Sequence, residues 1–120
     1  HWNSAGHGPV FCYRSQQSRI IELPPNDVPL GIAAKARYRN PEPLQLKAGD
    51  ILLIGTDGLW EASNPRGEMF SSDRLRQIIA SHRDKDARAI YQIVMQKIAE
   101  FRRTQIAEDD MTLMVIKVTE

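Results

Sequence analysis

Two runs of apolar residues, each bordered by acidic residues, constrain the fold of this chain more than any other feature. The first run covers residues 51–56 and leads directly into Asp57. The second covers residues 111–118 and directly follows Asp109 and Asp110. Apolar runs of this length, bounded by turn signals, are typical of strands that are buried on both faces. The sequence therefore predicts two central strands of one sheet, with covering layers on each side.

The composition favours a soluble folded domain, or a piece of one, over the other broad classes. The 120 residues are 42% hydrophobic and 26% charged, which is ordinary for a globular chain. The net charge of +1 lacks the basic excess of a nucleic-acid binder, so we expect no nucleic-acid partner. The single cysteine, Cys12, excludes a disulfide scaffold and suits a reducing compartment. No apolar run is long enough to cross a membrane, and we expect a cytoplasmic protein.

The rest of the chain divides into a strand-rich first half and a helical second half. Residues 9–14 and 18–23 are rich in β-formers and are separated by a short polar link, which predicts a hairpin. Weaker strand signals cover residues 33–39 and 43–46, and a turn at 47–50 leads into the first apolar run.

Helical spacing of apolar residues predicts two helices between the apolar runs. The first begins at Ser72, a residue type favoured at helix N-caps, and Asp73 suits its first turn. The second runs from about residue 86 to residue 104 with an apolar stripe at steps of four, four and three. These helices can cover one face of the sheet, and nothing in the sequence clearly covers the other.

The two acidic motifs stand at the ends of the two predicted central strands. If those strands are antiparallel neighbours, Asp57 and Asp109 lie at one sheet edge and can face a common point. Gathered carboxylates repel unless a cation compensates, and Mg²⁺ and Mn²⁺ prefer such oxygen ligands. Gly58 would let the chain turn sharply there. Taken one at a time, an Asp-Gly turn and a solvated Asp-Asp loop are the commoner interpretations.

Four segments, in this order, resemble the signature segments of bacterial serine phosphatases of the stage II sporulation protein E type. They carry the motifs Ala-Gly-His-Gly-Pro, Pro-Leu-Gly-Ile, a strand ending in Thr-Asp-Gly, and Asp-Asp-Met-Thr-Leu, within residues 4–9, 29–32, 46–62 and 109–113. That family belongs to the metal-dependent protein phosphatases, related to type 2C phosphatases. Several ordered motifs across nearly the whole chain are more specific than any one of them.

This resemblance implies an α/β (α+β) chain that forms part of a four-layer αββα sandwich. Residues 1–120 would be the C-terminal part of a single phosphatase domain. The implied cofactors are two Mn²⁺ or Mg²⁺ ions, with Asp57 and Asp109 as ligands, Asp110 in a second shell or on an additional ion, and Gly58 shaping the turn. The implied reaction is hydrolysis of phosphoserine or phosphothreonine by a metal-activated water. The implied substrate is a phosphorylated regulatory protein, such as an anti-sigma factor antagonist.

The chain also departs from the family pattern. The family carries another half before the segment at residues 4–9, and that half contains an acidic Asp-x-Gly motif whose Asp bridges the metals. We therefore expect a partial metal site, weak Mn²⁺ binding and no activity of the isolated chain. We also expect it to expose an apolar sheet face or to form a homodimer.

Two other interpretations stay open at this point. The chain could be a non-enzymatic, pseudophosphatase-like module that binds a partner, since fold alone does not fix function. It could also be an unrelated metal-binding protein with acidic loops, if the ordered motifs are coincidental. An acidic Asp-x-Gly motif upstream would favour the enzyme.

Overall fold

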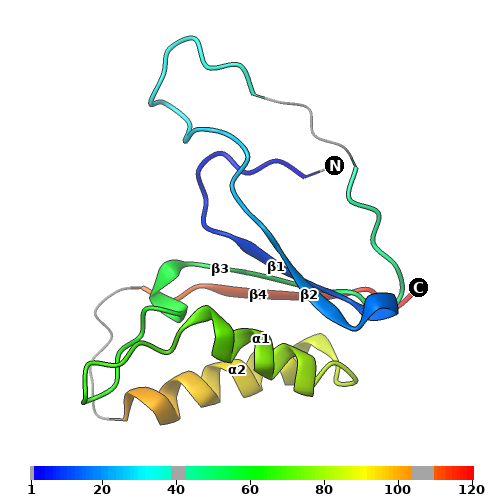
Figure 1. The fold of residues 1–120 in the computed structure, drawn as a ribbon, viewed down its shortest axis with the longest axis vertical. Helices are drawn as coiled ribbons and strands as arrows, with labels where there is room; N and C mark the ends of the chain where they lie inside the picture. The colour runs from blue at the N-terminus through cyan, green and yellow to red at the C-terminus, as the bar shows by residue number, and fades with distance from the viewer. Residues whose placement is uncertain (1, 39–42, 104–109) are drawn as a thin grey trace.

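The computed structural model describes residues 2–38, 43–103 and 110–120. It contains four strands, two α-helices and two short 3-10 turns, which confirms the expected mixed α+β class (Figure 1). In chain order these are β1 (Val10–Arg14), η1 (Ser15–Gln17), β2 (Arg19–Leu23), β3 (Ile51–Gly55), η2 (Asp57–Leu59), α1 (Ser72–Ser81), α2 (Ala87–Arg102) and β4 (Leu113–Lys117).

The four strands form one antiparallel sheet in the order β2-β1-β3-β4. The predicted hairpin is present, because β1 pairs with β2 and η1 connects them. β3 is central, as predicted, and lies between β1 and β4. The prediction that the last strand is also central is wrong, since β4 is an edge strand of the described sheet. β4 carries apolar residues on both faces, of which one packs against the core and the other is exposed.

Both helices lie on the same side of the sheet, as the ribbon shows (Figure 1). The core fills the space between the sheet and the helices, because alternate residues of β1 and β3 point toward the helices. The sheet and the helices both contribute side chains that are less than 2% exposed, among them Phe11, Ile51, Leu53, Leu75, Ile79, Ile90, Val94 and Ile98. The apolar stripe predicted for the second helix is therefore the face that packs on the sheet.

The helix boundaries differ slightly from the sequence prediction. The N-cap of α1 is Ser71, with φ 71°, and Ser72 is the first helical residue, so the prediction of Ser72 as the cap is wrong by one position. Asp73 lies in the first turn as expected. α2 is capped by Asp86, whose carboxylate accepts a hydrogen bond from the Ala89 N–H at 2.7 Å. Residue 104, the predicted end of the second helix, lies outside the described residues.

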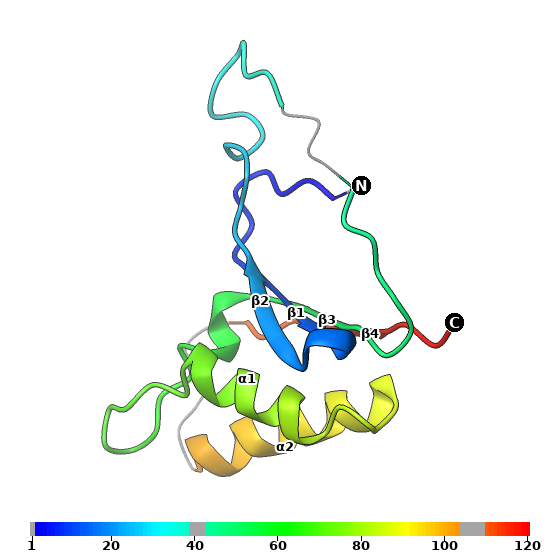
Figure 2. The ribbon, with the colours of Figure 1, turned by 45° about the vertical axis from the view of Figure 1, so that its right-hand side comes forward.

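The sheet face opposite the helices is apolar and is exposed where β4 forms its edge. Antiparallel pairing places Leu52 beside Ile116 and Ile54 beside Met114 on this face. Met114 is 55% exposed and Ile116 is 40% exposed, whereas their β3 partners are half-buried. Figure 2 shows the helices on the other side and the long segment after β2 rising away from the sheet. This agrees with the expectation of an exposed apolar sheet face.

The segment between β2 and β3 does not form the two weaker strands predicted from the sequence. Residues 33–38 and 43–46 carry no strand, and the remaining residues of those predictions, 39–42, lie outside the described part. Leu30 and Ile32 are 76% and 72% exposed, because the segment leaves the sheet and finds no strand to pair with. The radius of gyration, 15.6 Å, exceeds the value of about 14 Å expected for a compact domain of this length.

The turn before β3 is anchored by a buried carboxylate. Asp50 is 1% exposed and accepts hydrogen bonds from the Ser15 N–H at 2.8 Å and the Lys47 N–H at 3.0 Å. Burial alone would raise the pKa of Asp50, but these N–H groups, the Ser15 hydroxyl and the Arg14 guanidinium outweigh it and hold the pKa below its usual value. The ionised carboxylate thus ties the hairpin to the start of β3.

Candidate metal site

The two acidic motifs meet at one edge of the sheet, because β3 and β4 are antiparallel neighbours. Gly55, the last residue of β3, pairs with Leu113, the first residue of β4. Asp57 follows β3 by two positions, and Asp110 precedes β4 by three. The neighbouring arrangement of the two strands, on which the sequence argument depended, is therefore confirmed.

Thr56 joins the two motifs through its side chain. Its Oγ1 donates a hydrogen bond to the Asp110 carbonyl oxygen at 3.0 Å and accepts one from the Thr112 N–H at 3.0 Å. The Thr56 N–H donates to the Thr112 carbonyl oxygen at 3.1 Å, which continues the ladder beyond β3. Thr56 is a positioning residue that sequence reasoning missed, although its place between a buried strand and Asp-Gly was a usable signal.

Gly58 lies so close to the second motif that only glycine fits without a shift. A Cβ at this position would be 2.7 Å from the Asp110 carbonyl oxygen and 3.4 Å from the Met111 side chain. The glycine therefore permits the backbone of η2 to approach the backbone before β4. The expected role of Gly58, to shape the turn beside the acidic residues, fits this geometry.

Asp57 holds its carboxylate at the surface of this edge, on the hydrogen-bonded turn η2. Its side chain is exposed and accepts a hydrogen bond from the Gly58 N–H at 3.1 Å. Its carbonyl oxygen accepts from the Trp60 N–H at 3.0 Å and the Glu61 N–H at 2.9 Å, which fixes the backbone. Leu59, on the same turn, is fully buried and anchors η2 in the core.

The aromatic ring of Trp60 strengthens the anchor of this turn. It packs edge-on against Phe11 of β1, with ring centroids 5.8 Å apart and an interplanar angle of 84°. The contact is worth about 0.5–1.5 kcal/mol beyond the area that it buries. The Asp57 carboxylate thus lies on a turn whose Leu59 and Trp60 side chains pack against the core.

The donor type at this edge fits a hard divalent cation, but the described residues supply a partial set. Asp110 is exposed beside the turn, and Asp109 lies outside the described residues. Within the described ranges, no group of three or more His, Cys, Asp or Glu side chains could hold a metal ion. Carboxylate oxygens are nonetheless the ligands that Mg²⁺ and Mn²⁺ prefer, so Asp57 and Asp110 suit part of such a site.

The sheet with its helical layer defines the class of protein. The solved PP2C phosphatase domain of SpoIIE from Bacillus subtilis, with a fragment of its regulatory domain, matches with a TM-score of 0.74 and 25% identity. The match covers 95% of this chain and 32% of that one. The SiaA-PP2C domain of Pseudomonas aeruginosa shares the fold with a TM-score of 0.74 at 20% identity, over 91% of this chain and 42% of that one. The fold is that of PP2C-type phosphatase domains.

The family follows from the sequence comparison. The stage II sporulation protein E (SpoIIE) family matches residues 1–119, and the chain belongs to this family. The phosphoserine phosphatase RsbU of Bacillus subtilis is 26% identical over 114 residues, 95% of this chain and 33% of RsbU. Stage II sporulation protein E of the same organism is 27% identical over 113 residues, 94% of this chain and 13% of that protein. The chain thus spans a third or less of these two relatives.

In the part of the chain that the structure describes, neither helix has the length and apolar character needed to cross a membrane.

Proposed function

We propose that residues 1–120 form the C-terminal part of a metal-dependent protein serine/threonine phosphatase domain. The observation that carries this proposal is the antiparallel pairing of β3 with β4, which brings the Asp57 turn against the backbone of Asp110. Membership of the SpoIIE family and the PP2C fold support it. The single buried thiol, Cys12, is compatible with the cytoplasmic location that we propose.

In this proposal the acidic edge holds divalent cations. Asp57 and Asp109 are the ligands, Asp110 binds in a second shell or to an additional ion, and Gly58 gives the turn its close approach. Mn²⁺ and Mg²⁺ are the candidate ions, and one structure of the related SpoIIE phosphatase domain was obtained after a Mn soak. When bound, two such ions would supply an activated water that attacks a phosphoserine or phosphothreonine phosphorus in line, without a phosphoenzyme.

The chain's own residues prepare this edge in two ways. The Thr56 hydroxyl fixes the distance between the two acidic motifs through the Asp110 carbonyl oxygen. The Asp57 carboxylate is exposed and, among the described residues, accepts one hydrogen bond, from the Gly58 N–H, which leaves oxygen lone pairs for a cation. The proposed substrate is a phosphorylated regulatory protein, such as an anti-sigma factor antagonist, and similarity to the phosphoserine phosphatase RsbU supports phosphoserine as the residue that is dephosphorylated.

The metal site of this chain is proposed to be partial. The described residues bring no group of three metal-binding side chains together, and the chain spans a third of RsbU. Residues outside this chain would complete the site. The 120-residue chain is then expected to bind Mn²⁺ weakly and to lack activity, and pairing with a second copy is one way to cover its apolar sheet face.

Mn²⁺ binding tests the site directly, without relying on turnover. Titration of the chain with Mn²⁺, followed by the electron paramagnetic resonance signal of the free ion, should show weak binding that Asp57→Asn reduces about tenfold or more. Asp84→Asn, at an exposed carboxylate between the helices, is the matched control and should leave the affinity unchanged. Equal Mn²⁺ affinity of the Asp57→Asn variant and the unsubstituted chain would remove Asp57 from the site.

Phosphatase activity tests the reaction and the alternative together. The full-length protein should release phosphate from a phosphoserine peptide in the presence of Mn²⁺, and Asp57→Asn should abolish this. Peptide binding without any turnover in the full-length protein would instead favour the non-enzymatic partner-binding module. Hydrolysis of p-nitrophenyl phosphate by the 120-residue chain at the rate of an intact enzyme, lost in Asp57→Asn, would overturn the proposal of a partial site.

A further inference from the structure

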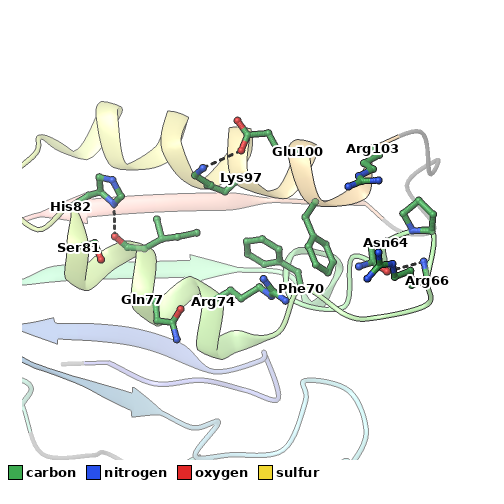
Figure 3. Close-up of a pocket in the computed structure, with 13 residues that line it drawn as sticks. Asn64, Arg66, Phe70, Arg74, Gln77, Ser81, His82, Lys97, Glu100 and Arg103 are labelled. Carbon is green, nitrogen blue, oxygen red and sulfur yellow. Dashed lines mark hydrogen bonds and ion pairs between the residues drawn. The ribbon is translucent and has the colours of Figure 1, made fainter.

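A cavity of about 600 Å³ opens on the helical layer, away from the sheet. It lies between α1, the C-terminal half of α2 and the loop that precedes α1 (Figure 3). Its volume is within the range of about 300–1,000 Å³ that is usual for ligand pockets. None of Asp57, Gly58 and Asp110 lines it, so what it binds is independent of the metal chemistry proposed above.

The floor of the cavity is aromatic. Phe70, from the loop before α1, and Phe101, from the last turn of α2, pack edge-on with ring centroids 5.3 Å apart and an interplanar angle of 75°. Phe70 is 3% exposed and belongs to the core, while Phe101 is half-buried. A large apolar side chain placed on these rings would gain both buried area and aromatic contacts.

The rim of the cavity is cationic. Four positively charged side chains line it, Arg66, Arg74, Lys97 and Arg103, against one carboxylate, Glu100. Figure 3 shows that they come from the loop, from α1 and from the end of α2. This local excess is large for a chain whose net charge is only +1. Such a rim attracts acidic ligands and disfavours basic ones.

Among the described residues, most of this positive charge has no carboxylate partner. Lys97 is paired with Glu100, with Nζ 3.1 Å from Oε2. Across the described residues, the guanidinium groups of Arg66, Arg74 and Arg103 form no ion pair with a carboxylate. Arg74 instead lies over the Phe101 ring at 4.7 Å from its centroid, so its charge stands directly beside the apolar floor.

We propose that this cavity docks an acidic peptide segment of a partner protein. An aromatic or large aliphatic side chain of that segment sits on Phe70 and Phe101, and flanking carboxylates pair with Arg66 and Arg74. Gln77 and Ser81, which also line the cavity from α1, add uncharged side chains that suit the amides of a peptide backbone. The occupant is thus defined by charge complementarity at the rim and by an apolar anchor at the centre.

The test uses fluorescence anisotropy of the full chain with a fluorescein-labelled peptide of sequence Asp-Glu-Phe-Asp-Glu. Two control peptides carry the same label: one replaces the central Phe by Gly, and the other replaces the four acidic residues by Lys. The proposal expects the first peptide to bind at least tenfold more tightly than either control. It also expects affinity to fall as salt is raised from 50 to 300 mM, because the ion pairs at the rim are solvent-accessible. Equal affinity for the three peptides would overturn it.

Charge-reversal variants locate the binding. Arg74→Glu and, independently, Arg66→Glu should each weaken binding of the acidic peptide tenfold or more. Arg88→Glu makes the same charge change at an exposed residue of α2 that does not line the cavity, and should leave the affinity unchanged. Circular dichroism identifies a variant that has lost its fold, and Arg66 lies on an exposed loop where this is not expected. Unchanged binding in a folded Arg66→Glu or Arg74→Glu variant, or equal loss in Arg88→Glu, contradicts the proposal.

Discussion

The Thr56 hydroxyl lies 3.0 Å from the carbonyl oxygen of Asp110 and donates a hydrogen bond to it. This contact joins residues from the end of β3 and the approach to β4, which are far apart in the sequence. It extends the pairing of the two strands to the point where the acidic motifs begin. The Thr56 side chain and the absence of a side chain at Gly58 thus add to the backbone pairing that positions one motif relative to the other.

Thr56→Val should loosen this junction while leaving the sheet folded. Valine keeps the β-branched shape but removes the hydroxyl that serves the Asp110 carbonyl oxygen and the Thr112 N–H. We expect a loss of about 1 kcal/mol in the free energy of unfolding, measured by urea denaturation. Thr112→Val is the control, because the Thr112 hydroxyl makes no hydrogen bond within the described residues and is exposed. Similar losses in the two variants would argue against a specific role of the Thr56 hydroxyl.

Gly58→Ala should displace the Asp57 turn. The added Cβ would stand 2.7 Å from a backbone oxygen, which cannot rotate away as a flexible side chain could. The expected cost is about 1–3 kcal/mol of unfolding free energy, together with weaker Mn²⁺ binding. Gly8→Ala is the matched control, since its Cβ would meet only Trp60 at 3.5 Å, an ordinary contact distance. A Gly58→Ala variant as stable as Gly8→Ala would show that the close approach carries no constraint.

Asp50→Asn should destabilise the turn before β3 in a pH-dependent way. The pKa of Asp50 is lower in the folded chain than its unfolded value of about 3.9. Its stabilisation is therefore complete above about pH 5 and is lost as pH falls through the lower, folded pKa. Urea denaturation at neutral pH should show Asp50→Asn less stable by about 1–3 kcal/mol. The difference should shrink below about pH 4. A difference that stays constant from pH 7 to pH 3 would exclude this account, and Asp84→Asn should have little effect at any pH.

The Cys12 thiol should be unreactive in the folded chain. It is 0% exposed between its strand neighbours Ile21 and Leu52. Burial raises its pKa, although Arg14 acts in the opposite direction. Labelling with 5,5′-dithiobis(2-nitrobenzoate) at pH 8 should be on the order of 100-fold slower in buffer than in urea. Comparable rates in the two solvents would mean that the open sheet face gives the reagent access to the thiol.

Local sequence signals predicted three of the four strands closely, together with both helices. β1, β2 and β3 coincide with their predicted positions to within a residue or so, because alternating or continuous apolar residues and flanking turns are local signals. The strand predictions for residues 33–39 and 43–46 are wrong where the structure describes these residues. A segment with β-propensity forms a strand only when a neighbouring strand is available to pair with it.

The candidate site residues could be named from the sequence and their metal-binding roles stay predictions, whereas the contacts among them are decided by the fold. Asp57, Gly58 and Asp110 could be named from motifs at strand ends. Asp109, named in the same way, lies outside the described residues, so its role stays a prediction. The Thr56 bridge was not foreseen. Its hydroxyl accepts a hydrogen bond from the Thr112 N–H and donates one to the Asp110 carbonyl oxygen, and these partners are defined only when the register of β3 and β4 is known.

By itself the sequence determined where β1, β2, β3 and both helices form, which of their faces are apolar and where the acidic motifs stand, because periodicity and turn chemistry are local properties. Only the tertiary structure decided that β4 is an edge strand and that the two motifs share one edge. It also decided that apolar side chains of β4 are exposed on one sheet face and that four cationic side chains gather around two aromatic rings between α1 and α2. These features depend on strand order and helix packing, in which residues distant in sequence become neighbours.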